Sequence, residues 1–340
     1  MKSFATFSVL AVALVASVGA SDHLCYPSAH KTCSAWPGEC STGTQQSPIN
    51  IANENGTALY QIEFSDEYKE ALNKPFIVNN GHTVQVSLNK ETTSDLTVTV
   101  RINGTSTTYV FAQLHGHWGS EHRIDNEDTT YVFAQLHGHW GSEHRIDNEE
   151  KHFEFHLVHY QKDLGSVSNA LAKNDPNGLL VLGVFFEASS TSKDNKAFEA
   201  LTKNVEQVKN ADPTTYKSCS GSLNMYDFLP LSGVNSFVGQ NVYDIAVYNG
   251  SLTTPGCNQI VRWFVFKKPI AISERQKEAF DVLKDSKGEE LKGNNRALQS
   301  LNGRNVIHAV VSEKTVGDAE VVYATASAFV SRIVSFFRSL

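Results

Sequence analysis

Histidines are the residues of this chain whose spacing could support chemistry, since nine of the 13 fall between positions 115 and 159. His137 and His139 lie in a strand-like run, and residues two apart on a strand point to the same face. His156 offers a third imidazole on a following strand-like run. Three imidazoles around a tetrahedral zinc ion leave a fourth position open, as in catalytic zinc sites. The pattern therefore indicates a zinc site, the alternative being a surface or stacked histidine pair.

The histidines are numerous because part of the sequence occurs twice. Residues 107–127 and 129–149 both read TTYVFAQLHGHWGSEHRIDNE. Solenoids need three or more repeats that drift in sequence, so two identical copies indicate a recent tandem duplication or an error in the gene model. Each copy supplies a glutamine, a His-x-His pair and a glutamate: Gln113, His115, His117 and Glu121 in the first, and Gln135, His137, His139 and Glu143 in the second.

The elements that must position these residues are mainly strands. Apolar or alternating runs predict strands over residues 76–78, 84–88, 96–102, 131–139, 153–159, 179–186 and 260–266. A helix is predicted over residues 274–283, where Ser273 could cap the first turn and Gln276 follows three residues later. No long linker divides the 340 residues, and a composition of 41% hydrophobic and 19% charged residues is that of a globular domain. The net charge of −7 provides no basic excess, which argues against nucleic acid as a partner.

The two ends of the sequence have patterns that differ from those of the central domain. Residues 1–20 have the pattern of a signal peptide, with Lys2 ahead of an apolar run, so the mature chain is expected to start at Ser21 and to be secreted. Secretion admits disulfides and glycosylation, and three sequons begin at Asn55, Asn103 and Asn249. Residues 312–340 form an extension whose apolar residues recur at helical intervals. This extension is either a peripheral membrane-surface helix or a helix docked on the domain or a partner.

Five motifs occur in an order that resembles the α-class carbonic anhydrases. They are QSPINI at 46–51, NNGH at 79–82, QLHGHWGSEH at 135–144, EFHLVH at 154–159 and GSLTTP at 250–255. The resemblance covers residues 34–311, after a short extension over 21–33. It implies a single α+β domain, mainly β with a few short helices, around a large, mostly antiparallel twisted central sheet. It also implies a lyase in which zinc-bound hydroxide attacks carbon dioxide reversibly to give bicarbonate and a proton, with sulfonamides and anions as inhibitors.

The resemblance assigns a role to each matching residue. It makes His137, His139 and His156 the zinc ligands, Thr253 the acceptor of the hydroxide's hydrogen bond, and Glu143 the carboxylate that orients Thr253. His82 matches the proton shuttle, with Asn80 and Gln85 ordering the connecting waters. Thr254 matches the contact for bicarbonate and inhibitors, and Gln135 and Glu154 match the hydrogen-bond acceptors behind His137 and His156. The resemblance also implies a Cys40–Cys257 disulfide. The apolar wall for carbon dioxide is matched by Val158, Val181, Leu252, Val261 and Trp263. Cys25, Cys33 and Cys219 receive no assignment.

The repeat leaves two candidate histidine pairs for one site. The interval from Glu143 to Glu154 matches that of the family. The interval from His82 to His115 also matches the family, whereas the interval from His82 to His137 is too long. We expect the second copy to bind the metal, because its histidines would form one hairpin with His156. The first copy, with His115 and His117 as alternative ligands beside Gln113 and Glu121, would then be an extruded loop that exposes Tyr109, Val110 and Phe111. The alternative functions are a non-catalytic binding module of the same fold and an inactive product of a duplicated or misassembled gene.

Overall fold

A nine-stranded sheet dominates the computed structural model, which describes residues 36–72, 75–87, 96–102, 105–113, 137–230, 242–291 and 293–313. Its strand order is β10-β13-β12-β14-β2-β5-β6-β9-β7, and β10 also pairs with β9. The nine strands are β2 (Thr57–Phe64), β5 (Thr97–Ile102), β6 (Thr105–Gln113), β7 (His137–Trp140), β9 (Phe153–Gln161), β10 (Leu179–Ser189), β12 (Val242–Gly250), β13 (Val261–Ser273) and β14 (Ile307–Glu313). Most of the pairs are antiparallel, while β10–β13 and β14–β2 are parallel. The predicted fold class, mainly β around one large twisted sheet, is confirmed.

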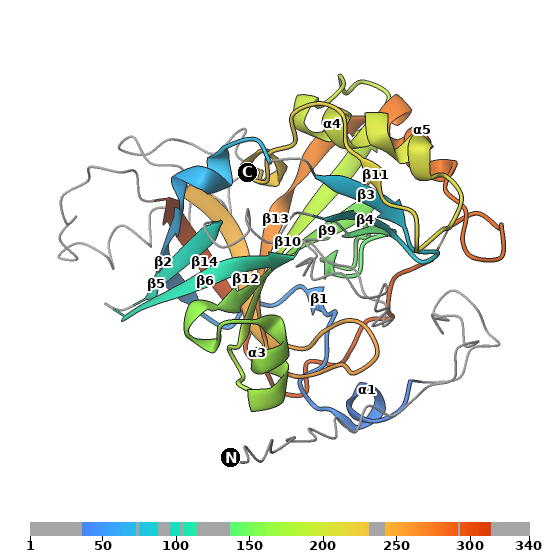
Figure 1. The fold of residues 1–340 in the computed structure, drawn as a ribbon. Helices are drawn as coiled ribbons and strands as arrows, with labels where there is room; N and C mark the ends of the chain where they lie inside the picture. The colour runs from blue at the N-terminus through green and yellow to red at the C-terminus, as the bar shows by residue number, and fades with distance from the viewer. Residues whose placement is uncertain are drawn as a thin grey trace, which may run out of the picture.

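Smaller elements surround this sheet. In Figure 1, helices α4 and α5 lie together at one end of the central strands and α3 lies at the opposite end. A three-stranded sheet has the order β11-β3-β4, and β1 pairs in parallel with β8. The bounds are α1 (Glu39–Thr42), β1 (Asn50–Ile51), β3 (Phe76–Asn79), β4 (Val84–Ser87), β8 (Arg145–Ile146), α3 (Val167–Lys173), α4 (Lys196–Val205), β11 (Lys217–Ser218) and α5 (Glu274–Asp281), with 3-10 turns η1 (Asp66–Lys69), η2 (Lys162–Leu164), η3 (Glu206–Val208) and η4 (Tyr226–Phe228).

Helix α5 begins where the sequence predicts. The Ser273 hydroxyl accepts a hydrogen bond from the Gln276 backbone N–H, and the Gln276 side chain accepts one from the Ser273 backbone N–H. This reciprocal capping box satisfies two backbone donors that the first helical turn would otherwise leave open. The helix ends at Asp281, two residues before the predicted end.

Strand β9 separates two buried clusters, because successive side chains of a strand point to opposite faces. Phe153, Phe155 and Leu157 belong to the larger apolar cluster. Val158 belongs to the second cluster, which lies beside the buried residues Glu154 and His156 on the other face of β9. The alternation therefore anchors one face of β9 in the core and presents its polar residues on the other.

The two copies of the repeat form strands in a way that differs from the prediction. Tyr109, Val110 and Phe111 are buried in β6, so the expectation that the first copy is extruded with these residues exposed is wrong. The first copy supplies β6 and the second supplies β7, and both pair with β9. A strand can start in one copy and finish in the other because the copies are identical, which satisfies the upstream and the downstream spacing together.

Several sequence predictions fall outside the described residues. These are the signal peptide over 1–20, the extension over 21–33, the sequon at Asn103, and most of the C-terminal extension over 312–340. Within the described ranges, no helix has the length and apolarity needed to cross a membrane.

Candidate metal centre

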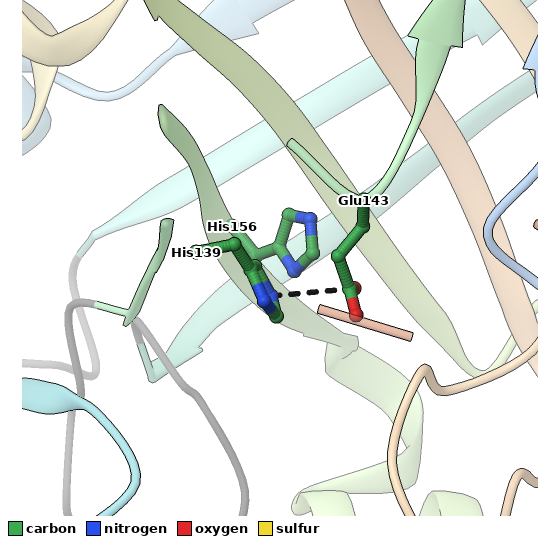
Figure 2. A group of neighbouring side chains, drawn as sticks. All are labelled: His139, Glu143 and His156. Atoms are coloured by element: carbon green, nitrogen blue, oxygen red, sulfur yellow. Dashed lines mark ion pairs between the residues drawn. The ribbon is translucent and has the colours of Figure 1, made fainter. Parts of the chain in front are cut away.

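Two imidazoles meet where β7 and β9 pair. His137 lies opposite His156, and His139 lies opposite Glu154. The rings of His139 and His156 are both buried, with centroids 4.9 Å apart, and Figure 2 shows them side by side. Strand pairing therefore brings together histidines that are 17 positions apart in the sequence.

Hydrogen bonds fix the tautomer of each ring. Nδ1 of His139 lies 2.8 Å from the carbonyl oxygen of Asn294, which can only accept, so this nitrogen carries the proton. Nε2 of His156 lies 2.9 Å from Oε1 of Glu154 and donates to that carboxylate. Burial lowers the pKa of His139 well below its usual value, with a further contribution from His156, and burial also lowers the pKa of His156. Both rings are therefore neutral, and Nε2 of His139 and Nδ1 of His156 carry lone pairs that suit a metal ion.

Glu143 completes a cluster with these histidines. Its Oε1 accepts a hydrogen bond of 2.8 Å from the Arg296 backbone N–H, and its Oε2 lies 3.2 Å from Nε2 of His139 (Figure 2). Burial raises the pKa of the Glu143 carboxyl well above its usual value, although hydrogen bonds from Thr253 and Arg296 oppose the shift. One potential ligand atom from each of His139, Glu143 and His156 lies within 4.8 Å of the others. The cluster could hold a metal ion.

A second buried network stands behind His156. Nδ1 of His144 lies 2.7 Å from Oε1 of Glu154, and Nε2 of His144 lies 2.5 Å from the Tyr248 hydroxyl, which donates to the Ser47 hydroxyl. Burial alone would raise the pKa of Glu154, but the neighbouring His144 and His156 hold that pKa well below its usual value. Glu154 is therefore an ionised acceptor that holds both rings in place.

The loop that carries Thr253 is tied to the N-terminal part of the domain. The Ser47 backbone N–H donates to the Ser251 hydroxyl, and the structure contains the Cys40–Cys257 disulfide that the resemblance implied. Thr253 and Thr254 are both buried, and within the described part of the chain the Thr254 hydroxyl has no hydrogen-bond partner. An unsatisfied buried hydroxyl is costly, so this position suits a polar ligand atom.

The structure also brings the five residues of the expected apolar wall together. All are at least nine-tenths buried, and all belong to the second apolar cluster: Val158, Val181, Leu252, Val261 and Trp263. The Trp263 indole N–H donates to the Ser251 carbonyl, which joins this cluster to the threonine loop. Burial is equally consistent with core packing, so the wall remains a prediction.

His82 is connected to the cluster through Asn294. The Asn294 side-chain amide donates to the His82 carbonyl, while the Asn294 carbonyl accepts from His139. His82 is half-buried, and the Asn80 amide lies within hydrogen-bond distance of Gln85. The backbones of Gln113 and His137 lie in β6 and β7, whereas His115, His117, Glu121 and Gln135 fall outside the described residues.

The sequence motifs did not single out Asn294, Arg296, His144 or Tyr248. Asn294 and Arg296 contact His139 and Glu143 through backbone groups, which no side-chain pattern reveals. His144 could have been found, because it ends the motif QLHGHWGSEH and directly follows Glu143, where it offers a further imidazole proton donor.

Comparison with known proteins identifies the family of the chain. The model of the eukaryotic-type carbonic anhydrase family matches residues 29–130 and again 127–310, so each match contains one copy of the repeat. Carbonic anhydrase 7 of Mus musculus is 33% identical over 273 residues, covering 77% of this chain and 87% of the relative. Carbonic anhydrase 4 of Oryctolagus cuniculus is 30% identical over 319 residues, covering 88% and 89%. Carbonic anhydrase 6 of Canis lupus familiaris is 28% identical over 301 residues, covering 85% and 77%. The chain belongs to the α-class, eukaryotic-type carbonic anhydrase family.

Proposed function

We propose that this chain is a zinc-dependent enzyme that catalyses the reversible hydration of carbon dioxide to bicarbonate and a proton. The observation that carries the proposal is the pair of buried, neutral imidazoles whose tautomers are set by the Asn294 carbonyl and by Glu154. Neutral imidazole nitrogens are common zinc ligands, and a buried Glu143 oxygen beside them has no hydrogen-bond partner among the described residues. The donor set therefore fits zinc, with His139 and His156 as ligands and His137 as the third.

The protein groups around this centre would divide the remaining work. Bound zinc would act as a Lewis acid and lower the pKa of a water molecule bound to it to about 7, a value established for carbonic anhydrases as a class. The Thr253 hydroxyl donates to Glu143, which leaves its lone pairs to accept a hydrogen bond from the attacking oxygen and to orient it. The buried wall that includes Val181 and Trp263 offers an apolar surface to carbon dioxide, which has no proton to donate. The imidazole of His82 would carry the released proton to solvent, since an ordinary histidine pKa is near 6.5.

Two further proposals concern the bounds of the catalytic domain and the location of the protein. We propose that residues 34–311 form the catalytic domain and that the protein is exported, with residues 1–20 as its signal peptide. The Cys40–Cys257 disulfide supports export, because disulfides persist mainly in oxidising compartments.

Zinc analysis combined with stopped-flow hydration of carbon dioxide tests the enzymatic proposal. The purified mature protein should contain one zinc ion per chain and should show turnover that a sulfonamide inhibits. His156→Ala is the matched control, because it removes a ligand from β9 and should abolish both zinc binding and turnover. Wild-type protein that binds no zinc, or that binds zinc without sulfonamide-sensitive turnover, would refute the proposal.

A further inference from the structure

The turn that carries His82 is held together by the side chains of two asparagines. The Asn80 side-chain oxygen accepts hydrogen bonds from the backbone N–H groups of His82 and Thr83, at 3.0 and 2.9 Å. The Asn80 backbone N–H donates to the Thr83 carbonyl, which closes the turn. The Asn79 side-chain oxygen accepts from the Gly81 N–H at 2.9 Å. The backbone N–H of His82 therefore has a fixed partner within the turn itself.

Asn294 holds the other backbone group of His82 from outside the turn. Nδ2 of Asn294 lies 3.0 Å from the His82 carbonyl oxygen and donates to it, although the two residues are 212 positions apart in the sequence. Asn294 is 2% exposed, so water does not compete freely for this bond. The backbone carbonyl of the same residue accepts from Nδ1 of His139, at 2.8 Å. One buried residue thus spans the gap between an expected metal ligand and the expected proton shuttle.

These bonds fix the backbone of His82 and leave only its side chain free to rotate. Because the N–H and the carbonyl are both held, the imidazole can move only by rotation about its side-chain bonds. A proton carrier has to reach the site and the solvent in turn, and a fixed backbone keeps both distances the same in every turnover. His82 is half-buried, which suits a residue that lies between the two.

We propose that Asn294 is a positioning residue for proton transfer, whose side-chain amide holds His82 at a set distance from His139. This inference rests on the proposed function and adds a residue to it. The backbone carbonyl of Asn294 serves the metal ligand, whereas its side-chain amide serves the shuttle. A substitution of the side chain therefore separates the two tasks, because every replacement except the side chain's own contact keeps the carbonyl that His139 uses.

The kinetics of Asn294→Ala test the positioning role. The proton is removed after bicarbonate has left, so slower proton transfer lowers kcat and leaves kcat/KM for carbon dioxide unchanged. We expect kcat in dilute buffer to fall by roughly tenfold, less than the ~100-fold or larger loss that removal of a general acid or base causes. Added imidazole buffer should restore kcat, because it accepts the proton in place of His82. Zinc affinity, measured by competition with a chelating dye, should stay within about threefold of the wild type, since the partner of His139 is kept.

Hydrogen exchange of the zinc-free protein tests the same contact without turnover. The backbone amides of residues 81–83 should exchange several times faster in Asn294→Ala than in the wild type, as measured by mass spectrometry of the peptide that contains the turn. Asn295→Ala is the matched control, because it removes the same kind of side chain from the next position, where the side-chain nitrogen lies beside Gly141. This control should leave the exchange of residues 81–83 and kcat at their wild-type values.

Far-ultraviolet circular dichroism checks that each variant folds. Asn294→Asp keeps the size of the side chain and loses the N–H donor, so it decides if Asn294→Ala does not fold. If neither folds while Asn295→Ala does, the side chain is needed for folding and the positioning role is overturned. Unchanged exchange at residues 81–83, equal falls in kcat and kcat/KM, or a loss of kcat that imidazole does not restore would also overturn it and leave the proposed function standing. A wild type that shows no zinc-dependent turnover would overturn both.

Discussion

Removal of one repeat should leave the sheet intact and make the protein more stable. Gln113 lies opposite Val158, and His137 lies opposite His156, so only Leu157 of β9 separates the two pairs. Deletion of residues 114–135 joins Gln113 to Leu136 and provides one residue for that interval. No strand has to change register, and both the upstream and the downstream intervals are kept.

The expected gain follows from the length of the connection. Residues 114–136 link two neighbouring points of the same partner strand. Closing a connection of this length costs about 3 kcal/mol more than a single-residue connection, by the logarithmic dependence of closure entropy on length. The deletion should therefore raise the free energy of unfolding by about 3 kcal/mol, measured by urea denaturation, and should retain one zinc ion per chain.

A deletion that is one residue shorter provides the control. Removal of residues 114–134 leaves an extra residue between Gln113 and Leu136, and a shift of one residue reverses the faces of a strand. This variant should be less stable than the 22-residue deletion and should lose zinc. If the 22-residue deletion itself lowers the free energy of unfolding, the sheet does not have the interrupted register described above, or residues 114–136 supply stabilising contacts.

Three other variants test separate parts of the structure. Thr253→Ala should lower the hydration rate by roughly 100-fold, the usual effect of losing one orienting hydrogen bond, and should keep zinc bound; loss of zinc by metal analysis would contradict its role. Cys40→Ser with Cys257→Ser opens a loop of 217 residues and should lower the free energy of unfolding by about 5 kcal/mol in urea, whereas an unchanged midpoint would show that the disulfide does not form. Burial lowers the pKa of His159 to about 3, between the Tyr68 hydroxyl and the Leu180 carbonyl, so its neutral form contributes stability that is complete above the unfolded-state pKa of about 6.5 and is lost as the pH falls toward 3. Between pH 7.5 and pH 5 this loss amounts to about 2 kcal/mol, and His159→Asn should remove that part of the pH dependence; an identical slope in wild type and variant would refute it.

Local patterns predicted the elements that depend on local interactions. The α5 capping box and strand β9 follow from residues that are near each other in the sequence. The division of the repeat between β6 and β7 did not follow, because identical copies give identical local signals and only the positions of β5 and β9 distinguish them. The sequence analysis predicts that only the second copy pairs beside His156, whereas in the structure each copy pairs with a different part of β9.

The candidate site could also be predicted only in part from local sequence patterns. Strand periodicity placed Glu154 and His156 on one face of β9, where they are in contact. It could not identify the Asn294 carbonyl or the Arg296 N–H, since every residue except proline has both groups and only tertiary structure selects which ones meet His139 and Glu143. Backbone partners from distant segments are thus the part of the site that a sequence motif omits.

The contacts of Asn294 and Arg296 have a consequence for the order of assembly during synthesis. All the histidines of the candidate site are made before residue 160, but the groups that set the His139 tautomer and hold Glu143 are made more than 130 residues later. A growing chain that has not reached residue 296 therefore carries the imidazoles without the partners that orient them. Arg296 also donates to the carbonyls of Cys40 and Ser47, so the same late segment fixes the earliest part of the domain. If the site holds zinc as proposed, tight metal binding is therefore expected only after residue 296 has been made, and a ribosome-bound or C-terminally truncated product should bind the ion more weakly.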